Sequence, residues 1–309
     1  MNPTSDRLRL YGALSALVVT WGIAFVGIKE ILHELGPSTL TILRFAIADV
    51  GLLILFAAVP STRPRFERSD WWRLVVLGIT GVPGYHLALN WGEQRTSASV
   101  ASLIVATAPV MVAIASAGIL RERVTARRWL GIVLALAGVV VLATASHGDG
   151  TSTRFTGVLV AILAPVSWAV YIIVAKPLTE RASSLQVTAT GMLIGSVALL
   201  PFVSGQTIHE IGNLSASGWA WMAQLSVGST LLGYFLFVWA LARLEATKVA
   251  VFLYGVPVVA ILSAWLILDE PLGLTVLAAA ALVITGVVLA QQERAGSPAG
   301  TVLPEEVGG

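Results

Sequence analysis

Apolar residues occur in long runs along this chain, and short polar segments separate the runs. Each run has at least about 18 residues with few charges, which is enough for a helix to cross the hydrocarbon core of a bilayer. Lipid offers no hydrogen-bond partners to backbone N–H and C=O groups, so runs of this length are expected to be α-helices. The pattern predicts ten transmembrane helices, at residues 10–31, 38–59, 72–92, 97–120, 128–146, 157–177, 185–205, 217–240, 248–268 and 273–291.

The lysine and arginine residues are distributed unevenly over the segments between these helices. If both termini are cytoplasmic, only Arg95 and Arg154 fall in outer segments. The inner segments then hold Arg7, Arg9, Arg63, Arg65, Arg68, Arg73, Arg121, Arg123, Arg127, Arg128, Lys176, Arg181, Arg243, Lys248 and Arg294. Because cytoplasmic loops of membrane proteins are rich in Lys and Arg, we predict a multi-pass protein of the cell membrane with both termini in the cytoplasm.

The composition agrees with this prediction. Hydrophobic residues make up 56% and charged residues 12% of the 309 positions, whereas soluble domains average about 25% charged residues. Without cysteine, the chain has no disulfide and no thiolate metal site. We expect residues 1–9 to be a cytoplasmic N-terminal segment, and residues 292–309, which lack an apolar run, to be a disordered cytoplasmic tail.

The chain repeats itself at a spacing of 147 to 148 residues. The matched pairs are Trp21 with Trp168 and Lys29 with Lys176 at 147, and Trp91 with Trp239, Pro109 with Pro257 and Glu122 with Glu270 at 148. Tryptophan, proline and glutamate are scarce in this sequence, so the matches indicate a duplication. The first unit spans residues 10–146 and the second spans residues 157–291.

Each unit carries five predicted helices, and an odd number makes the second unit enter the membrane from the opposite side. The predicted fold class is therefore an all-α integral membrane protein with ten transmembrane helices in two inverted five-helix repeats. Inverted repeats underlie alternating access in many secondary transporters, with the binding site near the midplane between the halves. This organisation favours transport of a small molecule.

Several segments resemble EamA-type members of the drug/metabolite transporter superfamily. They are TWGIAFVGIK at 20–29, LRFAIA around Arg44, ATAPV and ILRERVTARRWLG between 106 and 131, LYGVPVV at 253–259 and LILDEPL at 266–272. The resemblance implies a ten-helix exporter or importer of small metabolites that is driven by a proton or another gradient. The family's substrates include amino acids, sugars, nucleotide derivatives and drugs, so the resemblance leaves the substrate open.

Two charged residues fall inside the second predicted helix. Asp49 lies near the midplane, where members of this family more often have a small apolar residue, and a charge there is costly unless it is paired or hydrated. Asp49 is a candidate for proton coupling or for a counter-charge to a cationic substrate, and pairing with Arg44 or with another helix is the alternative. Arg44 is a candidate for binding an anion or carboxylate, unless its guanidinium extends to the membrane surface.

The third predicted helix holds the richest polar group. His86 and Asn90 are four residues apart and therefore share one face of the helix, with Tyr85 on an adjoining face. They line a substrate cavity or bond to a neighbouring helix. In the second unit the corresponding helix offers Tyr234.

Aromatic residues and prolines also mark the middle of the membrane. Trp21, Trp168, Tyr171 and Tyr254 are candidates for the cavity wall, where aromatic rings contact apolar or cationic groups, and packing is the alternative. Pro109 and Pro257 interrupt equivalent helices, and each removes one amide donor. Matched interruptions point to the binding region, so both prolines are candidate hinges.

Other classes of function fit the sequence less well. A membrane enzyme needs clustered carboxylates, histidines or a nucleophile with a base, and His86 is the sole histidine within the predicted spans. A small multidrug-type cation antiporter, a channel and a membrane scaffold are the remaining alternatives.

We predict a proton-linked or facilitated exporter of amino acids or similar metabolites that has no enzyme activity, cofactor, metal or nucleic-acid partner. Small residues in several helices also permit a homodimer.

Overall fold

The computed structural model describes residues 3–59, 62, 66–119, 125–144, 155–241, 243, 244 and 246–291. These residues form helices and connecting turns, with no strand among them. The helices of the first half are α1 (Pro3–Ile31), α2 (Pro37–Ala58), η2 (Arg68–Asp70), α3 (Trp71–Ile79), η3 (Thr80–Leu87), α4 (Ala88–Arg95), α5 (Ala98–Val105), α6 (Ala108–Ile119) and α7 (Ala126–Thr144). Those of the second half are α8 (Phe155–Ala161), α9 (Leu163–Thr179), α10 (Ser184–Val197), η4 (Leu200–Phe202), α11 (Gly205–Gly212), α12 (Ala216–Ala223), η5 (Gln224–Leu232), α13 (Gly233–Leu241), α14 (Ala246–Leu253), α15 (Gly255–Ile267) and α16 (Leu274–Gln291).

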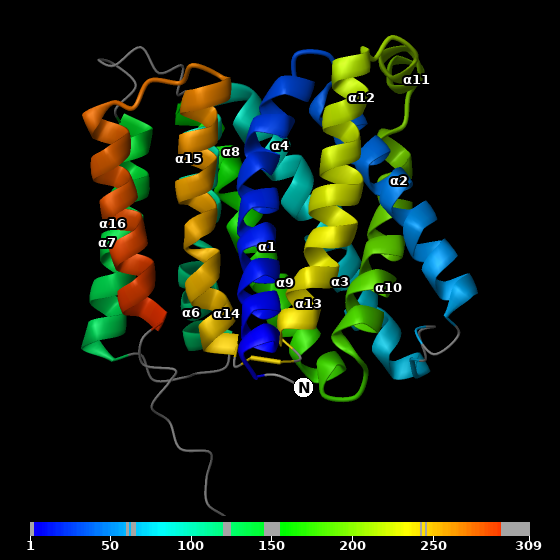
Figure 1. Ribbon diagram of the computed structural model, residues 1–309, viewed down its shortest axis with the longest axis horizontal. Coiled ribbons are helices and arrows are strands. Elements are labelled where there is room, and N and C mark those ends of the chain that lie inside the picture. The colour runs from blue at the N-terminus through cyan, green and yellow to red at the C-terminus, as the bar shows by residue number, and fades with distance from the viewer. Residues whose placement is uncertain are drawn as a thin grey trace, which may run out of the picture.

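Within the described residues, nine helical segments are long and apolar enough to cross a membrane. An additional apolar helix, Val251–Ile267, is shorter, and a turn interrupts it at Tyr254. All the segments lie on runs predicted from the sequence, and they stand side by side in one bundle (Figure 1). The first helix begins at Pro3 instead of residue 10, and α11 falls in a region for which no helix was predicted. The predicted tail at 292–309 lies outside the described residues.

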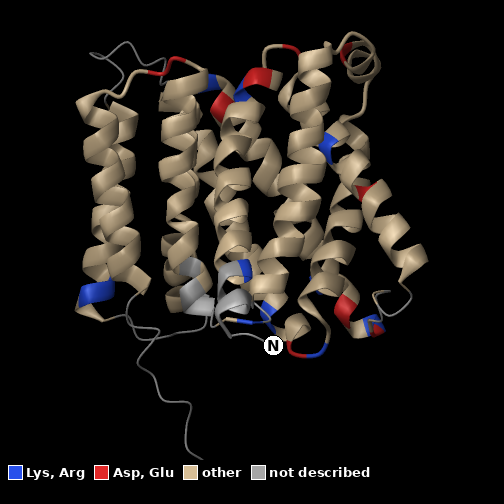
Figure 2. Ribbon diagram, in the orientation of Figure 1, with Lys and Arg blue, Asp and Glu red and all other residues tan. Residues whose placement is uncertain are grey.

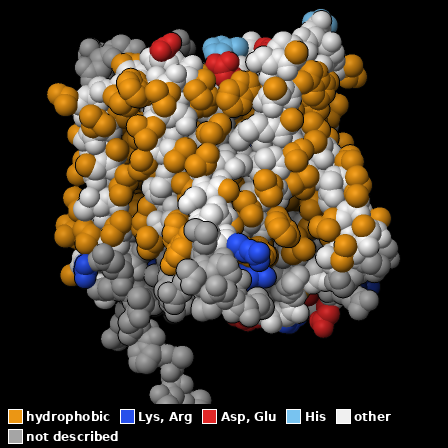
Figure 3. Space-filling view, in the orientation of Figure 1, with side chains coloured by type: hydrophobic (Ala, Val, Ile, Leu, Met, Phe, Trp, Pro, Cys, Tyr) orange, Lys and Arg blue, Asp and Glu red, His pale blue; other side chains and the backbone are white. Residues whose placement is uncertain are grey.

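Charged and apolar residues separate along the bundle. Lys, Arg, Asp and Glu gather toward the two ends of the helices, and few lie between them (Figure 2). On the face shown in Figure 3, hydrophobic side chains cover the surface between these ends. We call the end that contains residues 32–36 and 268–273 the upper end, and the end that contains residues 66–70 and 180–183 the lower end, as they lie in Figure 1.

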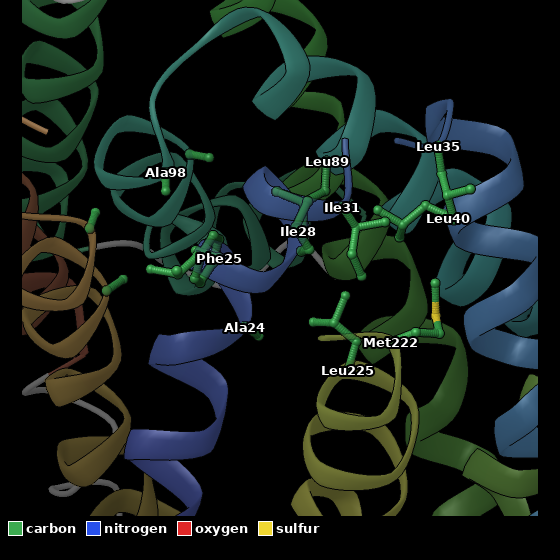
Figure 4. Packing of buried hydrophobic residues seen from close by; sticks show 14 of the residues in the cluster. Ala24, Phe25, Ile28, Ile31, Leu35, Leu40, Leu89, Ala98, Met222 and Leu225 are labelled. Atoms are coloured by element: carbon green, nitrogen blue, oxygen red, sulfur yellow. The ribbon is translucent and has the colours of Figure 1, made fainter. Parts of the chain in front are cut away.

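Helix α1 runs through the centre of the bundle. It packs against α15, α13 and η5 from the second half and against α5 from the first. Phe25 and Ile28 of α1 are almost completely buried, and they lie between Ala98 of α5 and Leu225 of η5 (Figure 4). The main apolar core is therefore built from residues that are far apart in the sequence.

Helices α7 and α16 form a close pair at one edge of the bundle (Figure 1). Gly131 of α7 faces Gly286 of α16, and a Cβ atom on Gly131 would lie 2.5 Å from the Gly286 carbonyl oxygen and 2.5 Å from the Ala290 amide nitrogen. No side chain fits at this distance from another backbone, so the glycines permit direct contact of the two helices.

Two pairs of helices depart from regular α-geometry at comparable places. The fourth apolar segment is interrupted at Ala106 and Thr107, before Pro109, and the ninth is interrupted at Tyr254, before Pro257. Both prolines therefore lie in the first turn of the helix that follows, where no intrahelical donor is needed. In addition, η3 and η5 are π-helical segments in the third and eighth apolar segments. Segments of this kind are often found at functional sites.

Polar contacts connect the helices at both ends of the bundle. At the upper end, Glu34 accepts hydrogen bonds from the backbone amide and hydroxyl of Ser215, at 2.8 and 2.7 Å. The side chain of Glu210 accepts one from the Gly36 amide at 3.0 Å. At the lower end, Arg181 forms an ion pair of 2.6 Å with Asp70. Each contact joins a residue of one half to a residue of the other.

The Glu34 contact predicts how acid affects stability. The backbone and side-chain hydrogen bonds from Ser215 hold the pKa of Glu34 below its usual value of 4.5. A carboxylate whose pKa is lowered by folding stabilises the folded state above the unfolded pKa, and this contribution disappears as the pH falls through the folded pKa. We therefore expect Glu34→Gln to lower the melting temperature in detergent at neutral pH, and the difference from the wild type to shrink as the pH falls below about 4.5.

The matched control for this experiment is Glu180→Gln, which makes the same chemical change at an exposed turn residue. Its melting temperature should follow that of the wild type across the pH series. If the melting temperatures of Glu34→Gln and the wild type differ by the same amount from neutral to acidic pH, the ionised Glu34 carboxylate does not stabilise the fold through Ser215.

Candidate functional site

Arg44 of α2 is buried inside the bundle and does not extend to the surface. Its side chain is 6% exposed, and its Nε donates a hydrogen bond of 2.9 Å to the hydroxyl of Thr230 in η5. The Thr230 hydroxyl in turn donates to the carbonyl of Leu225, five residues earlier, as the wider turn of a π-helix allows. The arginine thus connects the first half of the chain to the second, and extension to the membrane surface is excluded.

The polar residues of the third apolar segment lie together on one side, as their spacing predicts. His86 and Asn90 are both buried. Asn90 donates through Nδ2 to the hydroxyl of Thr41 in α2 at 2.9 Å, whereas its Oδ1 and the Nδ1 of His86 have no hydrogen-bond partner. Buried polar atoms without partners are uncommon in native structures. These two atoms are therefore candidates for contact with a ligand.

Most of the predicted aromatic residues form contacts between the halves or within the second half. Trp168 stacks on Tyr171 with ring centroids 4.9 Å apart, and the Tyr85 ring lies 5.7 Å from that of Trp168. The His86 ring contacts Tyr85 at 4.8 Å and Phe45 at 4.7 Å. We call Tyr85, His86, Trp168 and Tyr171 the aromatic cluster. It combines residues of η3 and α9.

Trp21 and Tyr234 form a second contact beside this cluster. Their ring centroids are 5.8 Å apart, and the Trp21 indole donates to the Ser229 carbonyl at 2.9 Å. Gly233 packs directly under the indole, because a Cβ atom there would overlap the ring. Tyr234 and Tyr85 are both electrostatic neighbours of Arg44. The predicted residues Trp21, Tyr85 and Tyr234 are therefore near the buried arginine.

Two predicted residues lie elsewhere. The Tyr254 hydroxyl bonds to Gln291 of α16, and its ring packs in the core around α7 and α16, away from the aromatic cluster. Asp49 is partly exposed and contacts Ser196 of α10, and one of its carboxylate oxygens is buried without a partner. No ion pair between Asp49 and Arg44 occurs among the described residues.

Glu93 of α4 is a buried charged residue that the sequence reasoning missed. Its side chain is fully buried, and neither carboxylate oxygen has a hydrogen-bond partner. The nearby Lys29 ammonium donates to the backbone carbonyls of Glu93 and Thr96, at 2.9 and 2.6 Å. The sequence feature that could have identified Glu93 is its position, one residue beyond the predicted end of the third helix.

Glu270 occupies the start of helix α5. Its carboxylate accepts hydrogen bonds from the amides of Ala98 and Ser99, at 2.7 and 3.1 Å, and from the Ser99 hydroxyl at 2.7 Å. A negative charge is favourable at a helix N-terminus, so Glu270 stabilises the first turn of this helix. Its repeat partner Glu122 lies outside the described residues. The described residues contain no group of three or more His, Asp or Glu side chains that could hold a metal ion.

A bundle of long apolar helices with buried charges at its centre defines a multi-pass membrane protein. A family model described as the EamA-like transporter family matches the chain twice, at residues 10–144 and 155–291. The chain belongs to the EamA-like transporter family, and it is a membrane transporter for a small molecule. The two matched regions coincide closely with the two repeat units predicted at 10–146 and 157–291.

Individual relatives cover nearly the whole chain. An uncharacterized transporter from Archaeoglobus fulgidus is 35% identical over 280 residues, which are 90% of this chain and 98% of the relative. A probable terminal-alkyne amino-acid exporter from Streptantibioticus cattleyicolor is 33% identical over 284 residues, which are 92% of this chain and 94% of the relative. One solved crystal structure has the same fold, with a TM-score of 0.61 and 21% identity over 94% of this chain and 99% of the other.

Proposed function

We propose that this transporter exports an amino acid or a similar metabolite across the cytoplasmic membrane by alternating access between two inverted five-helix units. Both termini are cytoplasmic in this proposal, so the upper end of the bundle faces outward. The positive charges of the sequence, which concentrate in the segments at the lower end, support this orientation.

The helix contacts support inverted units, because they occur in related pairs. Helix α1 packs on α15, and its counterpart α9 packs on α6. Helix α1 also packs on η5, and α9 packs on η3. The fifth helices of the two units, α7 and α16, pack on each other. An axis that exchanges the two units accounts for all of these contacts, and inverted repeats related in this way operate by alternating access.

The observation that carries the choice of substrate is the buried contact between Arg44 and Thr230 at the junction of the two units. A guanidinium in an apolar environment is suited to bind a carboxylate with two hydrogen bonds. The aromatic cluster and Trp21 offer flat apolar surfaces for the rest of the molecule. A carboxylate beside an apolar side chain is the combination found in a hydrophobic amino acid, and the relative named as an amino-acid exporter supports this choice.

Asp49 and the two prolines complete the proposal. Asp49 lies in the membrane with one unpartnered carboxylate oxygen, so it either couples transport to protons or balances a cationic substrate. The helix interruptions before Pro109 and Pro257 lie at matching places in the two units and serve as hinges.

Reconstituted transport tests this function. The purified protein in proteoliposomes would be given labelled amino acids, nucleosides, sugars and lipophilic cations, with and without a pH gradient. We expect accumulation of hydrophobic amino acids that follows the gradient, and we expect Asp49→Asn to abolish the effect of the gradient. The control is Glu180→Gln, an exposed carboxylate changed in the same way.

Each other outcome has a definite meaning. If flux of amino acids does not depend on the gradient in either protein, the transporter is a facilitator and the coupling role of Asp49 is wrong. If only sugars, nucleosides or cations are transported, the proposed substrate class is wrong.

A further inference from the structure

We propose that Glu93 is a proton-binding site of this transporter and that protons reach it from the upper end of the bundle past Lys29. The proposal rests on the proposed transport function and adds a second protonatable carboxylate to Asp49. It is carried by the position of Glu93, which is fully buried in α4 with both carboxylate oxygens lacking a hydrogen-bond partner.

An ionised carboxylate is stable inside a protein only when charged or polar groups replace its hydration. Glu93 has no such bond in this structure, although Lys29 is close. The Lys29 ammonium is already directed to the backbone carbonyls of Glu93 and Thr96 at the end of α4. The carboxylate can therefore take up a proton without breaking a hydrogen bond.

The charged and titratable neighbours of Glu93 come from three helices and one turn. They are Lys29 of α1, Arg44 of α2, Tyr85 of η3, and Glu270 between α15 and α16. The neighbouring helices α5 and α8 carry no titratable side chain. Helix α9 also packs on α4, but its Tyr171 bonds to Thr188 and its Lys176 is exposed. The buried Glu93 carboxylate therefore has two positive charges and one negative charge among its neighbours.

A cleft at the upper end provides a route for the proton. It has a volume of about 370 Å³, and its walls include Lys29, Glu30, His33, Asp269 and Glu270. Lys29 lines this cleft and also holds the end of the helix that carries Glu93. Glu270 lines it too, but its carboxylate is held by Ala98 and Ser99. Glu93 does not line the cleft itself, but its backbone carbonyl contacts Lys29, which does.

The proton step follows from this arrangement. A proton from water in the cleft binds a carboxylate oxygen of Glu93 and cancels its charge. The attraction between Glu93 and Lys29 is then lost, which weakens the contact of α1 with the end of α4. The proton leaves toward the opposite side after the two units have rearranged. One proton is bound and one is released in each cycle, so the charge on Glu93 is restored.

Infrared spectroscopy can detect this proton without knowledge of the substrate. The purified protein would be acidified, and absorption by protonated carboxyl groups would be recorded for the wild type, Glu93→Gln and Glu30→Gln. Glu30 lines the same cleft and is partly exposed. We expect the band of a carboxyl group shielded from water to be absent in Glu93→Gln and to remain in Glu30→Gln. An unchanged band in Glu93→Gln would overturn the proposal.

Two further measurements keep the result decisive. In Lys29→Gln the same band should appear at higher pH, because a positive charge opposes protonation of a neighbouring carboxylate. An unchanged pH profile would show that Lys29 does not influence the protonation of Glu93.

In proteoliposomes Glu93→Gln should exchange substrate without responding to a pH gradient, and full gradient-driven accumulation would also overturn the proposal. If the wild type transports no amino acid, the proposed function fails, while the infrared band still decides the role of Glu93.

Discussion

Replacement of Arg44 by methionine should weaken substrate recognition more than any other single change in the predicted cavity. The guanidinium is buried and donates to Thr230, so it is positioned to bind a carboxylate that enters the junction of the units. Hydrogen bonds to charged groups contribute about 1.5–3 kcal/mol, and about 1.4 kcal/mol corresponds to a tenfold change in affinity. We therefore expect substrate affinity to fall by about tenfold to a hundredfold.

The measurement is competition for transport or binding by an amino acid and by the matching amine that lacks the carboxylate. The wild type should prefer the amino acid, and Arg44→Met should lose that preference. Arg95→Met is the control, since Arg95 is exposed and donates to the Trp91 carbonyl of its own helix. Equal preference for the amino acid in the wild type and in Arg44→Met would show that Arg44 does not bind the carboxylate.

Alanine at position 131 should separate α7 from α16 and destabilise the bundle. A Cβ atom there would lie 2.5 Å from backbone atoms of α16, which have no rotamer by which to move away. Overpacking of this kind costs about 1–3 kcal/mol, although alanine favours a helix over glycine by about 0.5–1 kcal/mol. The steric term is the larger one, so the net effect is destabilising.

Gly118→Ala is the matched control for this prediction. No heavy atom lies within 4 Å of the Cβ position of Gly118 in α6, so only the helix preference remains and the melting temperature should rise slightly. The two variants are therefore expected to shift the melting temperature in detergent in opposite directions. A rise in both would mean that the contact between α7 and α16 can adjust freely.

Hydropathy predicted the positions of the apolar helices because the length of a membrane-crossing segment is fixed by the bilayer. It was less informative where the backbone departs from an α-helix. Pro109 and Pro257 indicated the interruptions in two helices, since proline removes a donor. The π-helical segment η3 contains Pro83, which was not used as a signal, whereas η5 contains no proline. Helix α11 was missed because its eight residues are too few and too polar to form an apolar run.

The candidate site was predictable only in part, for a related reason. His86 and Asn90 were placed on one face by their spacing, and both are buried. The partner of Arg44 was out of reach, because Thr230 is 186 residues further along the chain. Tyr254 was grouped with the other aromatic residues by its depth in the membrane, but it contacts α16. Depth follows from the sequence, whereas the direction of a side chain depends on how the helices pack.

The contacts of Glu270 also bear on how the protein is made. Helix α5 is synthesised early, but the carboxylate that caps its first turn comes from residue 270. Arg44 and Trp21 likewise have partners in η5, which is synthesised much later. While the ribosome is still translating the second unit, helix α5 of the first unit therefore has its own Ser97 cap but lacks the Glu270 carboxylate, and Arg44 lacks its native partner. The nascent chain completes its first half only when its last helices enter the membrane.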